Sequence, residues 1–416
     1  MKTNKITAVP RLRFPEFQGD GDWEIKQLGK VATFSKGKGL PKSYIDDKGT
    51  LPCIHYGELF TRYSEVINEV ISFTNVKEKW VLSEENDVLM PTSDVTPKGL
   101  AKASCINKSG IILGGDILVI RTDKSIINGE FLSRYIRLRE QKVLQYVTGS
   151  TVYHLYASAI NKLPLYLPHY NEQQKIADCS SSLDTLIQAE NEQLNALKEY
   201  KAGLIQQLFP AEGETTPKRR FAEFEDDGDW EEVKLGELCK ILMCKRVFTD
   251  QTNSLRGVPF YKIGTLGSSP DAFISRDLYE DYKSRYNFPK KGEVLLTCSG
   301  TVGKTIIYDG EDAYYQDSNI VWLDNPKQRI KNELLYYIVS NINWGILNST
   351  TITRIYGDDL RRLNIQFPSS SKEQQKIVDC LFSLDNLIQA KDNQIDALKE
   401  HKRGLMQQLF PVMDGE

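Results

Sequence analysis

A long internal repeat constrains this chain more than any other feature. Residues 172–210, which begin EQQKI and end QQLFP, recur as residues 373–411 with 27 identities in 39 positions. Chance matching would give about two identities in such a stretch. A second pair of segments, residues 13–29 and 220–236, shares 11 of 17 positions. The chain therefore consists of a lead-in, a variable block and a helical segment, followed by the same three parts again.

The longer repeated segments have the pattern of coiled-coil helices. Each is rich in Leu, Gln, Glu, Ala and Lys, has apolar residues at spacings of three and four, and ends at a proline. At about 1.5 Å per residue, each helix would be roughly 55 Å long. We expect the two helices to pair antiparallel, although each could instead pack on its own block. The predicted seam consists of Ile176, Leu183, Ile187, Glu190, Leu194, Leu197 and Leu204 in one helix and Ile377, Leu384, Ile388, Lys391, Ile395, Leu398 and Leu405 in the other.

The middle of the predicted seam differs in charge between the two copies. Glu190 stands in the first helix where Lys391 stands in the second. Equivalent central positions meet in an antiparallel pair, so opposite charges there would favour pairing within one chain over pairing of like helices. We expect Glu190→Lys to weaken the packing and Lys391→Glu to restore it, as measured by thermal unfolding of the single and double variants.

The two blocks between the repeats mix strand and helix patterns. Residues 115–122, 293–297 and 319–324 read as strands and residues 131–146 as a helix. We therefore predict an α+β fold with a pseudo-twofold internal repeat. Its four parts are a first variable domain with its lead-in (1–170), a first helix (171–210), a second variable domain with the repeated lead-in (211–370), and a second helix with a tail (371–416).

The cysteine content suggests an intracellular protein, and the small net charge gives it no strong overall electrostatic potential. The 416 residues carry a net charge of -3, and the seven cysteines are scattered like reduced thiols. No apolar run is long enough for a membrane span, and the start lacks the apolar core of a signal peptide, which favours a cytoplasmic location. Residues 1–170 hold 23 Lys and Arg against 18 Asp and Glu, whereas residues 211–368 hold 21 against 24. Nucleic-acid binding is thus permitted by the charge but not required by it.

Candidate contacts to nucleic acid lie where glycine and hydroxyl residues cluster beside lysine, and in a short stretch that the two blocks share. The clusters are residues 35–39, 91–102 and 297–304, and the shared stretch is residues 149–156 and 349–356. Such loops offer backbone N–H groups and cations to phosphates, but they can equally be solvated turns. The candidate residues are Lys36, Lys38, Thr92, Ser93, Lys98, Lys102, Tyr153, His154, Thr297, Ser299, Lys304 and Arg354.

Most sequence motifs that are typical of catalytic sites are incomplete in this chain. Residues 300–305, GTVGKT, resemble the end of a phosphate loop, but Cys298 stands at the first required glycine and a strand pattern follows instead of a helix. Asp271, Asp281 and Lys283 fit only a loose metal-dependent nuclease pattern. The four histidines are dispersed, Cys239 and Cys244 lack a second ligand pair, and the Asn/Asp-Pro-Pro-aromatic tetrad of amino methyltransferases is missing. The sequence therefore predicts no catalytic residue, metal site or cofactor in this chain.

The combination of repeats resembles the specificity subunit of type I restriction-modification systems over essentially the whole chain. Each block is led by a W-x4-LG element, Trp23 to Gly29 and Trp230 to Gly236, and is followed by an EQQKI...LDxLI...ALKExKxGLxQQLFP helix. The resemblance implies two target-recognition domains, each of which reads one half of a split double-stranded DNA target. It also implies that the two helices act as an antiparallel spacer, and roughly 55 Å of helix suits half-sites about one DNA turn, some 34 Å, apart.

The same resemblance implies partners that carry the chemistry. Two methyltransferase subunits would bind S-adenosylmethionine and methylate adenines, and restriction subunits would supply ATP- and Mg-dependent translocation and cleavage. This chain would be a non-catalytic reader. Two other functions stay open: a coiled-coil adaptor that does not read DNA, and a nuclease that uses Asp271, Asp281 and Lys283.

Overall fold

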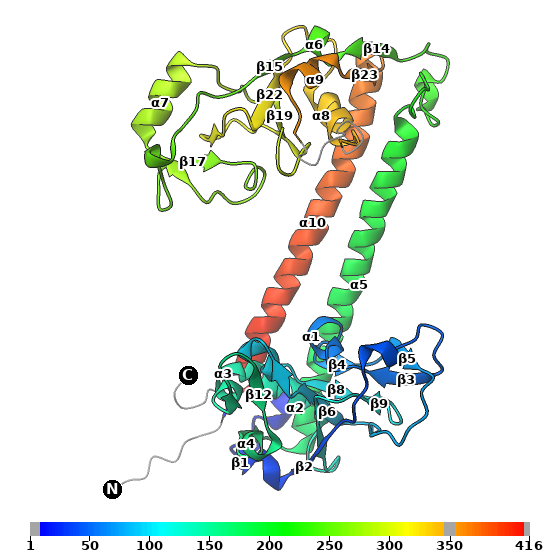
Figure 1. The fold of residues 1–416 in the computed structure, drawn as a ribbon, viewed down its shortest axis with the longest axis vertical. Coiled ribbons are helices and arrows are strands. Elements are labelled where there is room, and N and C mark those ends of the chain that lie inside the picture. Colours follow the sequence, from blue (N-terminus) through cyan, green and yellow to red (C-terminus); the bar gives the residue numbers. More distant parts are fainter. Residues whose placement is uncertain (1–8, 345–353, 412–416) are drawn as a thin grey trace. The chain divides into compact units, whose positions relative to one another are not determined.

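The computed structural model describes residues 9–344 and 354–411, and the chain divides into two compact units (Figure 1). Unit 1 contains the chain up to Glu192 and from Asn393 onward, and unit 2 contains Gln193–Asp392. Two helices of 39 residues, α5 (Tyr170–Leu208) and α10 (Ser371–Leu409), each contribute one half to each unit. Because these units cut across both helices, the four-part division expected from the sequence stays a prediction.

Unit 1 surrounds a five-stranded sheet with the order β2-β10-β6-β8-β4, accompanied by the smaller sheets β1-β13, β11-β12-β7 and β5-β3-β9. Its strands are β1 (Glu24–Gln27), β2 (Ala32–Lys36), β3 (Leu51–Ile54), β4 (Val66–Ile67), β5 (Ser72–Thr74), β6 (Asp87–Pro91), β7 (Ser93–Asp94), β8 (Ser104–Ile106), β9 (Ile112–Leu113), β10 (Ile117–Thr122), β11 (Val147–Thr148), β12 (Tyr153–Leu155) and β13 (Pro164–Leu167). Its shorter α-helices are α1 (Glu58–Thr61), α2 (Gly129–Leu138), α3 (Glu140–Leu144) and α4 (Ala157–Ile160).

Unit 2 contains two four-stranded sheets, β15-β22-β19-β20 and β16-β18-β17-β21, and the pair β14-β23. Its strands are β14 (Glu231–Lys234), β15 (Lys240–Leu242), β16 (Thr252–Asn253), β17 (Val258–Tyr261), β18 (Phe273–Ile274), β19 (Val294–Thr297), β20 (Thr305–Ile307), β21 (Tyr314–Tyr315), β22 (Ile320–Asp324) and β23 (Asn364–Phe367). Its shorter α-helices are α6 (Leu235–Leu238), α7 (Arg276–Arg285), α8 (Asn332–Ser340) and α9 (Gly357–Arg362).

The two units repeat one arrangement of central strands. In unit 1, β10 pairs antiparallel with β2 and β6, and in unit 2, β22 pairs in the same way with β15 and β19. The loop before each central strand holds a non-glycine residue in the left-handed region, Asp116 with φ 62° and Ser318 with φ 53°. The strands expected at 115–122, 293–297 and 319–324 are therefore confirmed as β10, β19 and β22.

The prediction of one continuous helix over residues 131–146 is wrong, because this segment contains two shorter helices. The chain forms α2 and α3 with a break at Arg139, whose backbone leaves the helical region at φ -99° and ψ 32°. The buried Arg139 side chain donates a hydrogen bond to the carbonyl of Pro411, just after α10. The break thus occurs where a long-range contact holds this arginine.

Each lead-in tryptophan packs against the end of the helix that belongs to the other repeat. In unit 1, Trp23 lies 6.0 Å from Phe410 between ring centroids, and both rings contact Phe131. In unit 2, Trp230 lies 5.9 Å from Phe209. The tryptophans and Phe410 are buried, and the repeated QQLFP ends complete the two hydrophobic cores.

Buried ion pairs attach each lead-in to the beginning of its own long helix. Arg13 forms two hydrogen bonds of 2.8 and 2.7 Å with the carboxylate of Glu172, and Arg220 forms two of 2.7 Å with Glu373. Both glutamates are almost fully buried. These pairs explain why arginine and glutamate recur at the same places in both repeats.

Within each unit the two long helices run antiparallel. In unit 1, Lys402 pairs with Asp184, and Gln394 donates to Glu190 at 3.4 Å. The same contacts recur in unit 2, where Lys201 pairs with Asp385 and Lys391 donates to Gln193 at 2.9 Å. In both cases, residue numbers increase along α5 while those of their partners decrease along α10, which is the antiparallel arrangement.

Each predicted seam residue is buried or half-buried. The direct pairing of Glu190 with Lys391 stays a prediction.

Candidate nucleic-acid interface

Four of the eight candidate residues in unit 1 line one cleft of about 550 Å³. Lys36 comes from the end of β2, Thr92 and Ser93 from the junction of β6 and β7, and His154 from β12. Phe34 and Leu118 add apolar side chains, and Tyr156 stands 55% exposed at the same cleft. We refer to it as the β2–β12 cleft.

Backbone hydrogen bonds fix the positions of these side chains. The N–H of Leu155 donates to the carbonyl of Thr92 at 3.0 Å, and His154 pairs in register with Ser93. On the opposite side, Lys36 Nζ lies 2.8 Å from the carboxylate of Asp116, which also accepts from Thr92 Oγ1 at 3.3 Å. The candidates are thus held by strands, which suits precise recognition.

The chemistry of the cleft fits base edges better than phosphates. The ring of His154 stacks on that of Tyr156, with 5.9 Å between centroids and 28° between planes. Exposed aromatic and apolar groups can contact a thymine methyl or a base face, and an imidazole can donate to or accept from a base edge. Lys36 is the cation of this set, and Asp116 neutralises part of its charge.

The remaining candidates of unit 1 lie elsewhere. Side chains alternate along β12, so Tyr153 packs against the hydrophobic core while its neighbour His154 lines the cleft. Lys38 pairs with Glu78 at 3.1 Å and lies over Trp80. Lys98 and Lys102 line a different hollow of about 540 Å³ together with Arg137.

Unit 2 places two of its candidates at the corresponding position. The N–H of Ile355 donates to the carbonyl of Cys298 at 2.8 Å, and Ser299 forms an isolated bridge with Arg354. The guanidinium of Arg354 lies 5.4 Å from the ring centre of Tyr356, which is 62% exposed. Arg354 therefore stands where unit 1 has His154, and Tyr356 where it has Tyr156. The echo between 149–156 and 349–356 predicted positions 154 and 354, but both tyrosines were missed although they end that echo. Residues 345–353 lie outside the described part.

The other two candidates of unit 2 belong to the fold of their loop. Thr297 is fully buried, its hydroxyl donates to the carbonyl of Thr301, and it accepts from the N–H of Lys304 at 3.1 Å. Gly303 has φ 82°, and a β-carbon there would meet the ring of Trp344 at 2.0 Å. The glycines and hydroxyls of residues 297–304 thus shape a turn that returns to β20.

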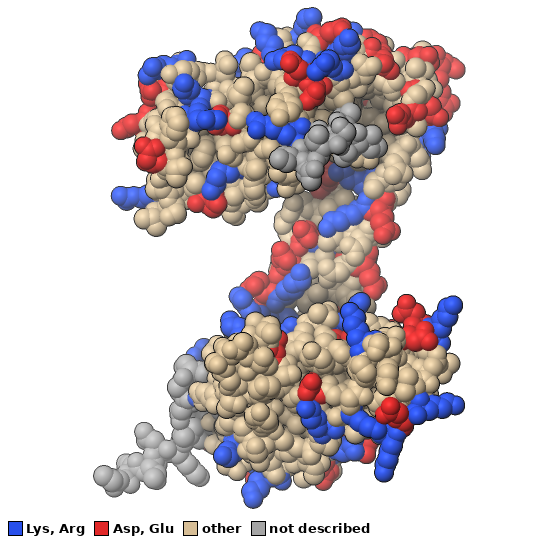
Figure 2. Space-filling model, in the orientation of Figure 1, with Lys and Arg blue, Asp and Glu red and all other residues tan. Residues whose placement is uncertain are grey.

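Charges on the surface do not form a single basic face in the view of Figure 2. Over unit 2, Lys and Arg side chains are interspersed with Asp and Glu, while unit 1 presents a broad uncharged area with charged groups around it. Unit 2 contains a net negative block, and Arg354 places a local cation at the candidate position that corresponds to His154.

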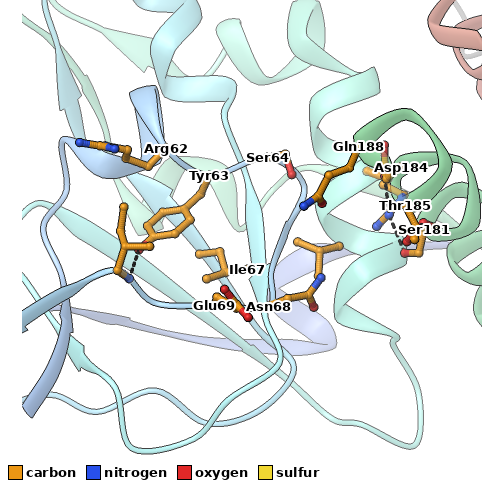
Figure 3. Close-up of a pocket in the computed structure, with 13 residues that line it drawn as sticks. Arg62, Tyr63, Ser64, Ile67, Asn68, Glu69, Ser181, Asp184, Thr185 and Gln188 are labelled. Atoms are coloured by element: carbon orange, nitrogen blue, oxygen red, sulfur yellow. Dashed lines mark hydrogen bonds and ion pairs between the residues drawn. The ribbon is translucent and has the colours of Figure 1, made fainter. Parts of the chain in front are cut away.

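A third hollow of unit 1, of about 440 Å³, is lined by none of the candidates (Figure 3). Residues 62–71 form one side of it, and Ser181, Asp184, Thr185 and Gln188 of α5 form the other. These segments are more than a hundred residues apart in the sequence, which explains why no local pattern predicted the hollow.

The residues of the nuclease alternative each engage a different cation or hydroxyl. Asp271 pairs with Lys262 at 2.9 Å, Asp281 pairs with Arg285 at 2.9 Å, and Lys283 donates to the hydroxyl of Tyr279. Across residues 9–344 and 354–411, no group of three potential metal ligands occurs, and no helix is both long and apolar enough to span a bilayer. The described contacts therefore do not assemble the nuclease set.

Comparison with known proteins identifies the family. The model of the type I restriction modification DNA specificity domain matches residues 20–199 and again residues 227–400. The chain belongs to this family. Its two copies of the specificity domain confirm the family and the repeated fold that the sequence predicted.

Relatives from the specificity family share sequence identity with this chain over stretches of different length. A Haemophilus influenzae protein named "Putative type I restriction enzyme specificity subunit S.HindORF215P" is 46% identical over 155 residues, which are 37% of this chain and 40% of that relative. The MjaVIII specificity subunit of a type I restriction enzyme from Methanocaldococcus jannaschii is 25% identical over 98% of this chain and 96% of its own length.

Solved structures share the specificity-subunit fold. The type I restriction-modification S subunit from M. genitalium superimposes with a TM-score of 0.62 at 14% identity, covering 97% of this chain and all of that one. A chain from a study of complex assembly and conformational transition of the type I system gives a TM-score of 0.55 at 19% identity, over 94% and 97% of the two chains.

Proposed function

We propose that each unit of this specificity subunit reads one half of a bipartite double-stranded DNA target. The observation that carries this proposal is the equivalence of the two reading positions. His154 pairs with Ser93 in unit 1, and Arg354 pairs with Ser299 in unit 2. An exposed tyrosine, Tyr156 or Tyr356, lies next to each of them, so the two positions are equivalent although their side chains differ. Equivalent positions with different side chains suit two different half-sites. Arginine favours guanine, through paired bonds to O6 and N7.

The chemistry in this proposal belongs to partner subunits. Two methyltransferase subunits bind S-adenosylmethionine and modify adenines, and restriction subunits use ATP and Mg to move and cut DNA. The present chain acts in the cytoplasm as a non-catalytic reader, and α5 and α10 set the half-site spacing and dock the methyltransferases. Membership in the specificity family supports this division of work.

Single-molecule methylation mapping tests the proposal. Genomic DNA is compared between cells that express this chain with its methyltransferase partner and cells that lack only this chain. We expect a split motif with methyladenine in both halves, present only with this chain. If both proteins fold and associate but methylation is unchanged, the adaptor function would replace the reader function.

Point variants sharpen the same experiment. We expect Arg354→Ala to relax one base pair in one half of the motif and His154→Ala to relax the other half, each by about 1–3 kcal/mol of discrimination. Lys26→Ala, which removes an exposed pair with Glu24 outside the cleft, is the control that leaves both halves unchanged. Relaxation of both halves by either variant would contradict two independent readers.

A further inference from the structure

We infer that unit 1 has a second binding site, separate from the β2–β12 cleft, for a small phosphate monoester with an apolar body. The site is a pocket of about 270 Å³ between α2, α5 and α10, which we call the three-helix pocket. Arg134, Arg137 and Leu138 of α2, Ser180 of α5, and Lys402 and Arg403 of α10 are among its lining residues.

Two buried hydrogen-bond donors in this pocket have no partner. Arg134 is 4% exposed and Ser180 is fully buried, yet Arg134 Nε and Ser180 Oγ make no hydrogen bond within the described structure. The other nitrogens of Arg134 are engaged, with Nη2 donating to Ser181 at 2.8 Å and to Asp184 at 3.1 Å. Figure 3 shows these two acceptors on α5. Buried donors are normally satisfied, so two unpartnered donors on residues that line one pocket indicate a missing acceptor.

The charge around the pocket favours an anionic acceptor. Five lining residues are cationic, namely Arg134, Arg137, Lys399, Lys402 and Arg403, whereas Glu65 is the one lining residue with a carboxylate. Among the described residues, Lys399 pairs with Asp396 and Arg403 with Glu400, each within an exposed helical turn, and such pairs compete weakly with a ligand. Burial lowers the pKa of Arg137, so an added negative charge nearby would stabilise this cation.

The walls of the pocket are apolar and limit the size of the ligand. Leu138, Met406 and the aliphatic stems of the cationic side chains line the pocket beside Arg134 and Ser180. A free hydrated ion would gain little from such walls, whereas a phosphate on a small aromatic or aliphatic group would use both the donors and the apolar surface.

Unit 2 provides an internal comparison. There Lys201 and Asp385 repeat the pair of Lys402 and Asp184, so the helical frame is the same. Tyr337 takes the role of Arg134 and donates to Asp385 at 2.7 Å. At the repeat positions of Ser180 and Arg403, unit 2 has the buried Leu381 and Ala202. The frame therefore does not require the donors and cations of unit 1.

Isothermal titration calorimetry on the full chain tests the inference, with phenyl phosphate as the probe. We expect one bound molecule per chain at millimolar concentration, with weaker binding of inorganic phosphate and none of benzyl alcohol. Arg403→Ala and Lys399→Ala should each weaken phenyl phosphate binding, the two together at least tenfold. Lys198→Ala, at the repeat position of Lys399 in unit 2, should leave it unchanged.

Ser180→Leu gives unit 1 the side chain of the corresponding place in unit 2 and should abolish binding. Circular dichroism melting of each variant checks that it is folded, and the exposed Arg403 and Lys399 variants decide the result if Ser180→Leu unfolds. The inference is overturned if folded wild-type chain does not bind phenyl phosphate, or if benzyl alcohol binds equally well. Displacement of phenyl phosphate by short duplex DNA would instead assign the pocket to the DNA backbone.

Discussion

Arg13 and Arg220 each hold a glutamate that is almost fully removed from water. The hydrogen bonds that these two arginines donate to Glu172 and Glu373 raise the pKa of both arginines, so both guanidinium groups stay charged. A buried ion pair adds little beyond what a well-packed apolar pair would give, but the loss of one partner leaves an uncompensated buried charge. This asymmetry explains why both partners occur together in each repeat.

Removal of Arg13 should therefore be costly. We expect Arg13→Ala to lower the free energy of unfolding of unit 1 by about 3–5 kcal/mol because Glu172 remains buried and unpaired. Urea unfolding followed by circular dichroism measures this change. Lys26→Ala, which removes an exposed pair with Glu24, is the control and should cost less than about 1 kcal/mol. Equal effects of the two substitutions would refute the burial argument.

Most thiols of the chain should be inert when it is folded. Cys53, Cys105, Cys239, Cys244 and Cys298 are buried, and burial raises the pKa of Cys53 to about 11 and that of Cys298 to about 12. We expect an aromatic disulfide reagent at pH 8 to modify only the half-buried Cys179 and Cys380 quickly, because a thiolate is the reactive form. Fast modification of all seven in native protein would contradict the buried positions.

The two long helices act as shared elements, because each unit contains half of both. Their contacts come in symmetric sets, with Lys402 and Asp184 in unit 1 and Lys201 and Asp385 in unit 2. Tyr337 adds a second hydrogen bond to Asp385, and Lys201 lies over its ring. The lysine is only partly exposed in both pairs, so water screens these pairs less than a free surface pair.

Double-mutant cycles should detect this coupling. For Lys201→Ala combined with Asp385→Ala, we expect a coupling energy of about 0.5–2 kcal/mol in urea unfolding. A cycle on Lys399 and Asp396, an exposed pair within α10, should give a value near zero. No difference between the two cycles would show that the contact between the helices adds nothing to stability.

The sequence predicted the elements better than the contacts between them. The seam, the strands β10, β19 and β22 and the two helix ends follow from local periodicity and prolines, which act within a few residues. The packing of Phe410 on Trp23 joins positions almost four hundred residues apart, and no local pattern carries that information. The candidate positions 154 and 354 came from the similarity between residues 149–156 and 349–356, which the sequence shows directly. The three-helix pocket is built from distant segments, so no such similarity predicted it.

At the scale of the whole molecule, each unit consists of one variable block and one half of each long helix. The repeated residues hold these pieces together, while the proposed reading positions 154 and 354 differ. Exchange of one variable block should therefore alter one half of the methylated motif and leave the other half intact. Methylation mapping of cells that express the exchanged chain measures this. A change in both halves would show that the blocks do not read independently.

The symmetric pairing of Asp184 with Lys402 and of Asp385 with Lys201 also has a genetic consequence. If two genes of this kind recombine within the stretch that encodes a repeated helix, the product inherits the same carboxylate and lysine positions from either parent. A new reading block can thus enter a chain without any matching change in the partner helix. The repeated frame would let a lineage of such proteins acquire new targets by shuffling whole blocks.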